Sequence, residues 1–137
     1  MSNRFVVLLI DDDLDDQDVF LFVMSELFPE IDCALANDGL HALDVINSLP
    51  SVALKLILVD INMPKMNGIE FLVTIRKMKD LEKIPIYMYS TSAHDDLIHR
   101  CIEVGATGFI KKPSDISTLK NRIEEIISQL KLPYERL

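Results

Sequence analysis

The chain has 137 residues, which fits a single domain and leaves little room for a second. Hydrophobic residues make up 49% and charged residues 26%, a composition typical of folded globular proteins and not of disordered chains. The 22 acidic residues outnumber the 14 basic ones, for a net charge of -8. Direct binding to nucleic acid or to an anionic membrane is therefore disfavoured, because neutralising phosphates requires surplus lysine and arginine.

The N-terminal sequence and the cysteines indicate a cytoplasmic protein. Only six apolar residues, 5–10, precede a cluster of acids, too few for a signal peptide or a membrane span. Cys33 and Cys101 lie in no CxxC pattern and in no Cys/His pattern with metal-site spacing. We therefore expect two reduced thiols, packed as small apolar side chains.

The first half of the chain alternates between two hydrophobic periods. Residues 5–10 (FVVLLI) are apolar on both faces, as in a parallel strand covered by helices on both sides. Residues 15–28 follow with helical period, and a weaker apolar run occupies residues 31–36. Residues 39–49 predict a second helix, which Pro50 ends.

The second half repeats this alternation three times. Apolar runs predict strands at residues 54–59, 84–89 and 107–110. Helical period predicts helices at residues 64–78, 93–104 and 114–130. Pro64 is placed near the start of the first of these helices, and Gly105 supplies the stop of the second.

Five strand–helix units predict an α/β fold with a five-stranded, doubly wound parallel sheet. A chain of this length favours the flavodoxin-like (βα)5 arrangement with strand order 2-1-3-4-5. We expect one domain over residues 4–131, followed by a short C-terminal tail at residues 132–137.

Polar residues follow the predicted strands where ligands bind in such sheets, beyond the carboxyl ends. Asp11 and Asp12 follow the first strand, Asp60 the third, Ser90 the fourth and Lys112 the fifth. Clustered carboxylates repel one another and favour a compensating cation, and oxygen ligands suit Mg2+. Acids, a hydroxyl and a lysine around a metal are the groups that phosphoryl chemistry needs.

The remaining aspartates near the first strand, the histidines and the methionines are interpreted as structural. The neighbouring acids are expected to cap and solvate the first helix: Asp13, Asp15, Asp16 and Asp18. The three histidines share no metal-site spacing and are predicted to be exposed helix residues: His41, His94 and His99. The methionines are expected to fill the core.

Four sequence segments, in order and with compatible spacing, carry a resemblance to a known family. They are LIDD at residues 9–12, LVDINMP at 58–64 followed by Asn67-Gly68, PIYMYS at 85–90, and GATGFIKKP at 105–113. Over residues 4–131 the chain resembles the receiver domain of two-component response regulators. Thr91 stands where that family usually has a smaller residue, which predicts restricted access to the site.

The resemblance implies a Mg2+-dependent phosphoacceptor. Asp60 matches the aspartate that takes a phosphoryl group from a histidine kinase or a histidine phosphotransfer protein. Asp11, Asp12 and Asp60, with the backbone carbonyl of Asn62, match the groups that hold Mg2+. Ser90 and Lys112 match the residues that contact the phosphoryl group.

The resemblance also implies how a signal leaves the domain. Ser90 and Phe109 match the pair of switch residues, and Pro113 matches a proline preceded by a cis peptide bond. The expected output is contact with a downstream protein or a homodimer, through the fourth helix, fifth strand and fifth helix (residues 94–103, 107–111 and 117–129). We expect a stand-alone signalling switch that is not an enzyme, because it catalyses only its own phosphorylation and dephosphorylation.

Three alternatives have weaker support. An aspartyl-phosphate phosphatase of the haloacid dehalogenase type needs an acid two positions after its nucleophile, where this chain has Asn62. A flavodoxin-like FMN binder needs a phosphate loop after the first strand, where the acids at residues 11–13 would repel phosphate. A receiver scaffold that never takes phosphate is the third alternative, although every expected site residue is present.

Overall fold

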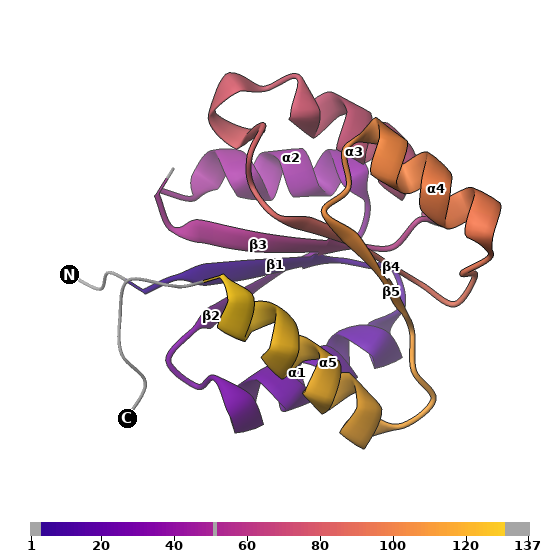
Figure 1. Cartoon of the computed structure of the whole chain (residues 1–137). Helices are drawn as coiled ribbons and strands as arrows, with labels where there is room; N and C mark the ends of the chain where they lie inside the picture. The colour runs from indigo at the N-terminus through magenta and orange to yellow at the C-terminus, as the bar shows by residue number, and fades with distance from the viewer. Residues whose placement is uncertain (1–3, 51, 131–137) are drawn as a thin grey trace.

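The computed structural model describes residues 4–50 and 52–130, so the tail predicted at residues 132–137 lies outside the described residues. Over these residues, five strands and five helices alternate (Figure 1). The strands are β1 (Val6–Ile10), β2 (Asp32–Ala36), β3 (Leu54–Val59), β4 (Ile86–Ser90) and β5 (Gly108–Lys111). The helices are α1 (Leu14–Leu27), α2 (Gly39–Ser48), α3 (Gly68–Arg76), α4 (Asp95–Val104) and α5 (Ile116–Gln129), with a short 3-10 turn, η1 (Lys79–Leu81).

All neighbouring strands pair in parallel, in the order β2-β1-β3-β4-β5, which confirms the predicted topology. The helices cover both faces of the sheet: α2, α3 and α4 lie on one side, and α1 and α5 on the other (Figure 1). The sheet order reverses between β1 and β3, so their carboxyl ends flank the crevice in which such folds bind ligands.

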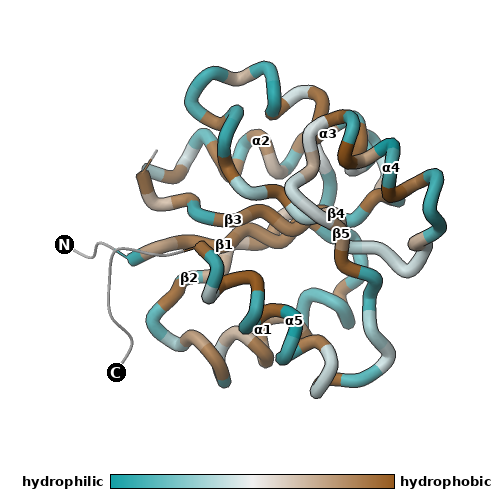
Figure 2. Tube along the Cα trace, viewed as in Figure 1, coloured by the Kyte–Doolittle hydropathy of each residue, from teal (hydrophilic) through white to brown (hydrophobic). Residues whose placement is uncertain are grey.

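Each face of the sheet has its own hydrophobic core, because successive side chains of a strand point to opposite faces. In β1, Val6, Leu8 and Ile10 pack on the face that carries α2, α3 and α4, whereas Val7 and Leu9 pack on the α1 and α5 face. The strands are accordingly apolar along most of their length (Figure 2). Both cysteines are free thiols; Cys101 is buried and Cys33 is half-buried.

The third helix starts four residues later than predicted, at Gly68 instead of Pro64. The reason is a capping box: the Asn67 side chain accepts from the Glu70 backbone N–H at 2.9 Å, and the Glu70 carboxylate accepts from the Asn67 backbone N–H at 3.0 Å. Pro64 therefore lies in the preceding loop. The other predicted element ends differ from the observed ones by two residues or fewer.

Two smaller expectations are also corrected. His94 is not a helical residue but the N-cap of α4, with its Nδ1 atom accepting from the Leu97 backbone N–H at 3.2 Å. The described residues contain no cis peptide bond, so the bond before Pro113 is trans, the isomer that X–Pro bonds themselves favour. Among the described helices, none is both long enough and apolar enough to span a membrane.

Candidate functional site

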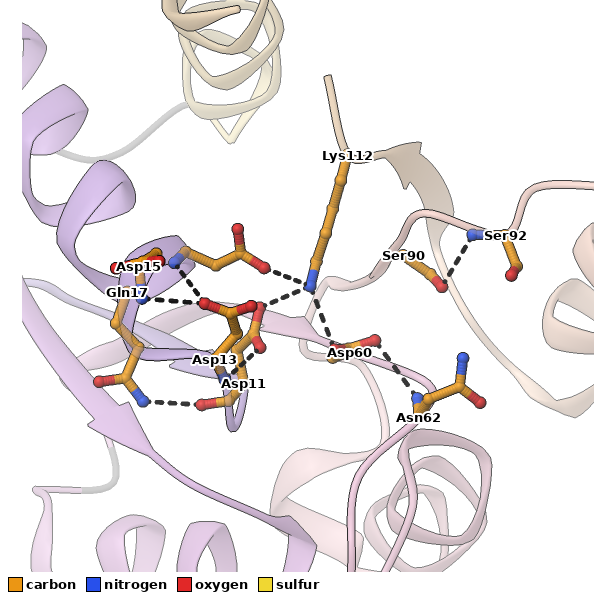
Figure 3. Close-up of polar contacts among 10 residues, drawn as sticks. Asp11, Asp13, Asp15, Gln17, Asp60, Asn62, Ser90, Ser92 and Lys112 are labelled. Carbon is orange, nitrogen blue, oxygen red and sulfur yellow. Dashed lines mark hydrogen bonds and ion pairs between the residues drawn. The ribbon is translucent and has the colours of Figure 1, made fainter. Parts of the chain in front are cut away.

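The polar residues predicted at the strand ends meet at one edge of the sheet. Asp11 follows β1, Asp60 follows β3, Ser90 ends β4, and Lys112 follows β5 and reaches toward the two aspartates (Figure 3). The backbone N–H of Lys112 donates to the Ser90 carbonyl at 2.8 Å, which ties the ends of β4 and β5 together. Parallel pairing thus brings residues about a hundred positions apart in sequence into contact.

Lys112 is the centre of the site. Its Nζ atom lies 2.7 Å from an Asp16 oxygen, 2.9 Å from Asp11 Oδ2 and 3.1 Å from Asp60 Oδ2. Burial alone would lower the pKa of Lys112, but the close contacts with Asp16 and Asp11 and the charges of Asp11 and Asp60 together raise it. The amine therefore stays protonated, and one positive charge faces three carboxylates.

Asp11 is a fully buried carboxyl group. Burial raises its pKa from 3.8 to about 6, although a hydrogen bond from the Asp13 backbone N–H to Asp11 Oδ1, 3.0 Å long, and the nearby Lys112 oppose the rise. Among the described residues, Asp11 Oδ2 has no hydrogen-bond partner, and it lies 2.9 Å from the Lys112 Nζ atom. A nearby cation favours the charged form of such a buried carboxyl group.

The donor set at this edge fits a hard divalent cation. One carboxylate oxygen from each of Asp11, Asp12 and Asp60 lies within 4.8 Å of the others. Asp11 and Asp60 are buried, while Asp12 is exposed, so the cluster opens to solvent on one side. The three donor atoms are all carboxylate oxygens, which suits Mg2+.

The loop after β3 is folded closely around Asp60. The Asn62 backbone N–H donates to Asp60 Oδ1 at 3.3 Å (Figure 3). A Cβ atom at Gly68 would lie 2.3 Å from the Asp60 carbonyl oxygen, so only glycine allows α3 to begin this close to Asp60. Lys65 turns the same loop with a positive φ of 62°. The metal-ligand role of the Asn62 carbonyl remains a prediction.

Ser90 is buried beside this cluster, and its Oγ atom accepts from the Ser92 backbone N–H at 3.3 Å (Figure 3). Thr91 is exposed at the rim. Phe109 is half-buried and packs against the core on the α2, α3 and α4 side. The structure therefore brings Ser90 to the site. The switch role of Phe109 stays a prediction.

Sequence reasoning missed two residues of the site. Asp16 was expected to cap and solvate α1, but the N-cap is Asp13, and the Asp16 side chain pairs with Lys112. Gln17 is buried, and its Nε2 atom donates to the Asp11 carbonyl at 2.7 Å and to Asn37 Oδ1 at 3.0 Å. Helical spacing alone places neither side chain toward the sheet edge, because the rotation of α1 against the sheet is set by packing.

An aromatic ring lines the α1 side of the site. Tyr89 is buried in the core between the sheet and helices α1 and α5, and the Lys112 Nζ atom lies 5.2 Å from its ring centroid. This distance is typical of a cation–π contact. Burial, followed by the nearby Asp16 charge, raises the pKa of Tyr89 to about 12, so its hydroxyl group stays neutral.

Comparison with known proteins finds both related sequences and similar structures. The family model described as the response regulator receiver domain matches residues 7–124. The two-component response regulator ORR11 of Oryza sativa subsp. indica is 32% identical over 120 residues, which cover 85% of this chain and 79% of that protein.

Solved structures show the same fold. The chemotaxis response regulator CheY4 of Vibrio cholerae superposes with a TM-score of 0.78 and 26% identity, covering 90% of this chain and 98% of that one. The phosphorylated cyanobacterial phytochrome response regulator RcpA superposes with a TM-score of 0.82 and 24% identity, covering 96% of this chain and 99% of that one.

Proposed function

The chain belongs to the response regulator receiver domain family, and we propose that its switch is phosphorylation of Asp60 in a Mg2+-dependent reaction. The observation that carries the proposal is the Lys112 ammonium, which lies within 3.1 Å of both Asp11 and Asp60 at the crevice between β1 and β3. Asp60 is the carboxylate that would carry the phosphoryl group. A positive charge beside it stabilises the negative charge that develops on the phosphoryl oxygens during transfer.

In the proposed reaction, an Asp60 carboxylate oxygen attacks the phosphorus of a phosphohistidine. A P–O bond forms as the P–N bond breaks, and the electron pair of the broken bond goes to the imidazole nitrogen of the donor. Lys112 would pair with a phosphoryl oxygen, and the Ser90 hydroxyl would donate to another. Water then hydrolyses the acyl phosphate and regenerates the Asp60 carboxylate.

Asp11, Asp12 and Asp60 would hold the Mg2+ ion, with the Asn62 carbonyl as a further ligand. When bound, Mg2+ would neutralise charge on the transferring phosphoryl group. The three carboxylates, and the buried Asp11 oxygen that accepts no hydrogen bond in the described part of the chain, support this assignment.

The proposed partners follow from the same chemistry. The phosphoryl donor is a histidine kinase or a histidine phosphotransfer protein, and the output is a downstream protein or a second copy of the chain that contacts α4, β5 and α5. With Asp60 as both acceptor and site of hydrolysis, the protein turns over no separate substrate and acts as a switch, not an enzyme. We propose the cytoplasm, where such phosphodonors are made, as its location.

The test is incubation with acetyl phosphate, with and without Mg2+, followed by intact-mass measurement. We expect a single phosphoryl adduct that needs Mg2+, is absent in Asp60→Asn, and persists in the matched control Asp44→Asn, whose exposed carboxylate lies on α2. An adduct on the Asp60→Asn protein, or one that forms equally without Mg2+, would contradict the proposal.

A further inference from the structure

The Lys112 ammonium has one more carboxylate partner than the proposed phosphoryl transfer needs. Its shortest contact, 2.7 Å, is with Asp16, which belongs neither to the metal cluster nor to the phosphoacceptor. Its Nζ atom donates hydrogen bonds to Asp16 and Asp60 and lies 2.9 Å from Asp11 Oδ2, so the ammonium contacts three carboxylates at once. In the metal-free protein, three carboxylates therefore share the positive charge of Lys112.

The start of α1 explains why the Asp16 side chain can make this contact. Asp16 is the third residue of the helix, where an acidic side chain in a capping box accepts the backbone N–H of the N-cap residue. Here the backbone N–H of the N-cap Asp13 donates to Asp11 Oδ1 instead, at 3.0 Å. Asp16 is left without a capping role, and its carboxylate pairs with Lys112.

Burial and an aromatic contact confine the ammonium beside α1. The Lys112 side chain is only 10% exposed, and its Nζ atom lies over the buried Tyr89 ring. The Asp16 side chain is 32% exposed, which makes it the most solvated of the three carboxylates in contact with Lys112. The contact is thus part of a packed arrangement, although it lies closer to the surface than the contacts with Asp11 and Asp60.

We propose that Asp16 is a positioning residue that acts through Lys112. By pairing with the ammonium it offsets part of the positive charge that faces Asp11 and Asp60, and so keeps these two carboxylates available to a divalent cation. Without Asp16, the full charge of Lys112 would act on Asp11 and Asp60, and Mg2+ would have to bind against it. This inference rests on the metal site of the proposed function.

The first test is calorimetric titration of Mg2+ alone into the wild type, Asp16→Asn and Asp15→Asn. Both substitutions remove one negative charge from the first turn of α1, but no ion pair joins Asp15 to Lys112 in the described part of the chain. We expect Asp16→Asn to weaken Mg2+ binding by about threefold to tenfold, within the range for directly coupled residues, and Asp15→Asn to weaken it by less than about twofold. Asp16→Glu should restore most of the affinity.

The second test repeats both substitutions in a Lys112→Met background. If Asp16 acts through the ammonium, Asp16→Asn should now change the Mg2+ affinity no more than Asp15→Asn does. If Asp16→Asn weakens Mg2+ binding as much in the Lys112→Met background as in the wild type, Asp16 acts only as a distant negative charge. That result would overturn the proposal. Thermal melting of each variant shows whether it is folded.

A third measurement needs no metal. The 15N resonance of Lys112 Nζ in metal-free protein should move in Asp16→Asn and stay in place in Asp15→Asn; an unmoved resonance in both overturns the inference. If the wild type fails to bind Mg2+ at millimolar concentration, the metal site of the proposed function is wrong, and this resonance alone decides whether Asp16 holds the ammonium.

Discussion

Replacing Asp11 with asparagine should stabilise the metal-free protein at neutral pH. Asp11 is fully buried, and burial raises the pKa of its carboxyl group from 3.8 to about 6. An acid whose pKa is higher in the folded state binds its proton more tightly there, so the folded state loses stability as the pH rises from 3.8 to about 6 and does not regain it above. The difference between the two pKa values corresponds to about 3 kcal/mol in free energy of unfolding, since each pKa unit is worth about 1.4 kcal/mol.

Asparagine keeps an oxygen that can accept from the Asp13 N–H but carries no charge. We therefore measure urea denaturation with EDTA at pH 8. The free energy of unfolding of Asp11→Asn should exceed that of the wild type by about 1–3 kcal/mol, since the raised pKa already includes the opposing effect of Lys112. The advantage should shrink as the pH falls through 6 and vanish near pH 3.8. An Asp11→Asn protein that is less stable than the wild type at pH 8 would refute the reasoning. The control is Asp44→Asn, which removes one negative charge from an exposed position.

The sequence predicted the fold well because the signals for it are local. The apolar run at residues 54–59 coincides with β3, and turn residues mark the ends of the other strands within two positions. The predicted start of α3 was wrong because Pro64 is a residue typical of a helix N-terminus. The Asn67–Glu70 capping box was visible in the sequence and gives the correct start.

The site was predictable only as far as it depends on strand ends. Asp11, Asp60, Ser90 and Lys112 each follow or end a strand, so parallel topology alone brings them to one edge. Asp16 does not follow a strand. Its contact with Lys112 depends on how α1 is rotated against the sheet, and on the backbone N–H of Asp13 being used by Asp11, and neither can be read from residue spacing.

Two further predictions concern the loop around Asp60 and the output surface. Gly68→Ala should lower the free energy of unfolding by about 2 kcal/mol or more in urea denaturation, because the new Cβ atom would meet the Asp60 carbonyl oxygen at 2.3 Å. Gly39→Ala should cost less, since the atoms nearest to its Cβ atom belong to the Met66 side chain and not to the backbone. Equal losses would contradict this explanation. Phe109→Ala should leave phosphorylation of Asp60 intact but weaken phosphate-dependent dimerisation or partner binding. Phe109 is half-buried at β5, next to β4, whose last residue is Ser90, so a shift of the Ser90 hydroxyl toward a phosphoryl group would make space that the ring can fill. Amide exchange on phosphorylation should then change over α4, β5 and α5, and changes confined to α1 would show that the output surface is wrongly assigned.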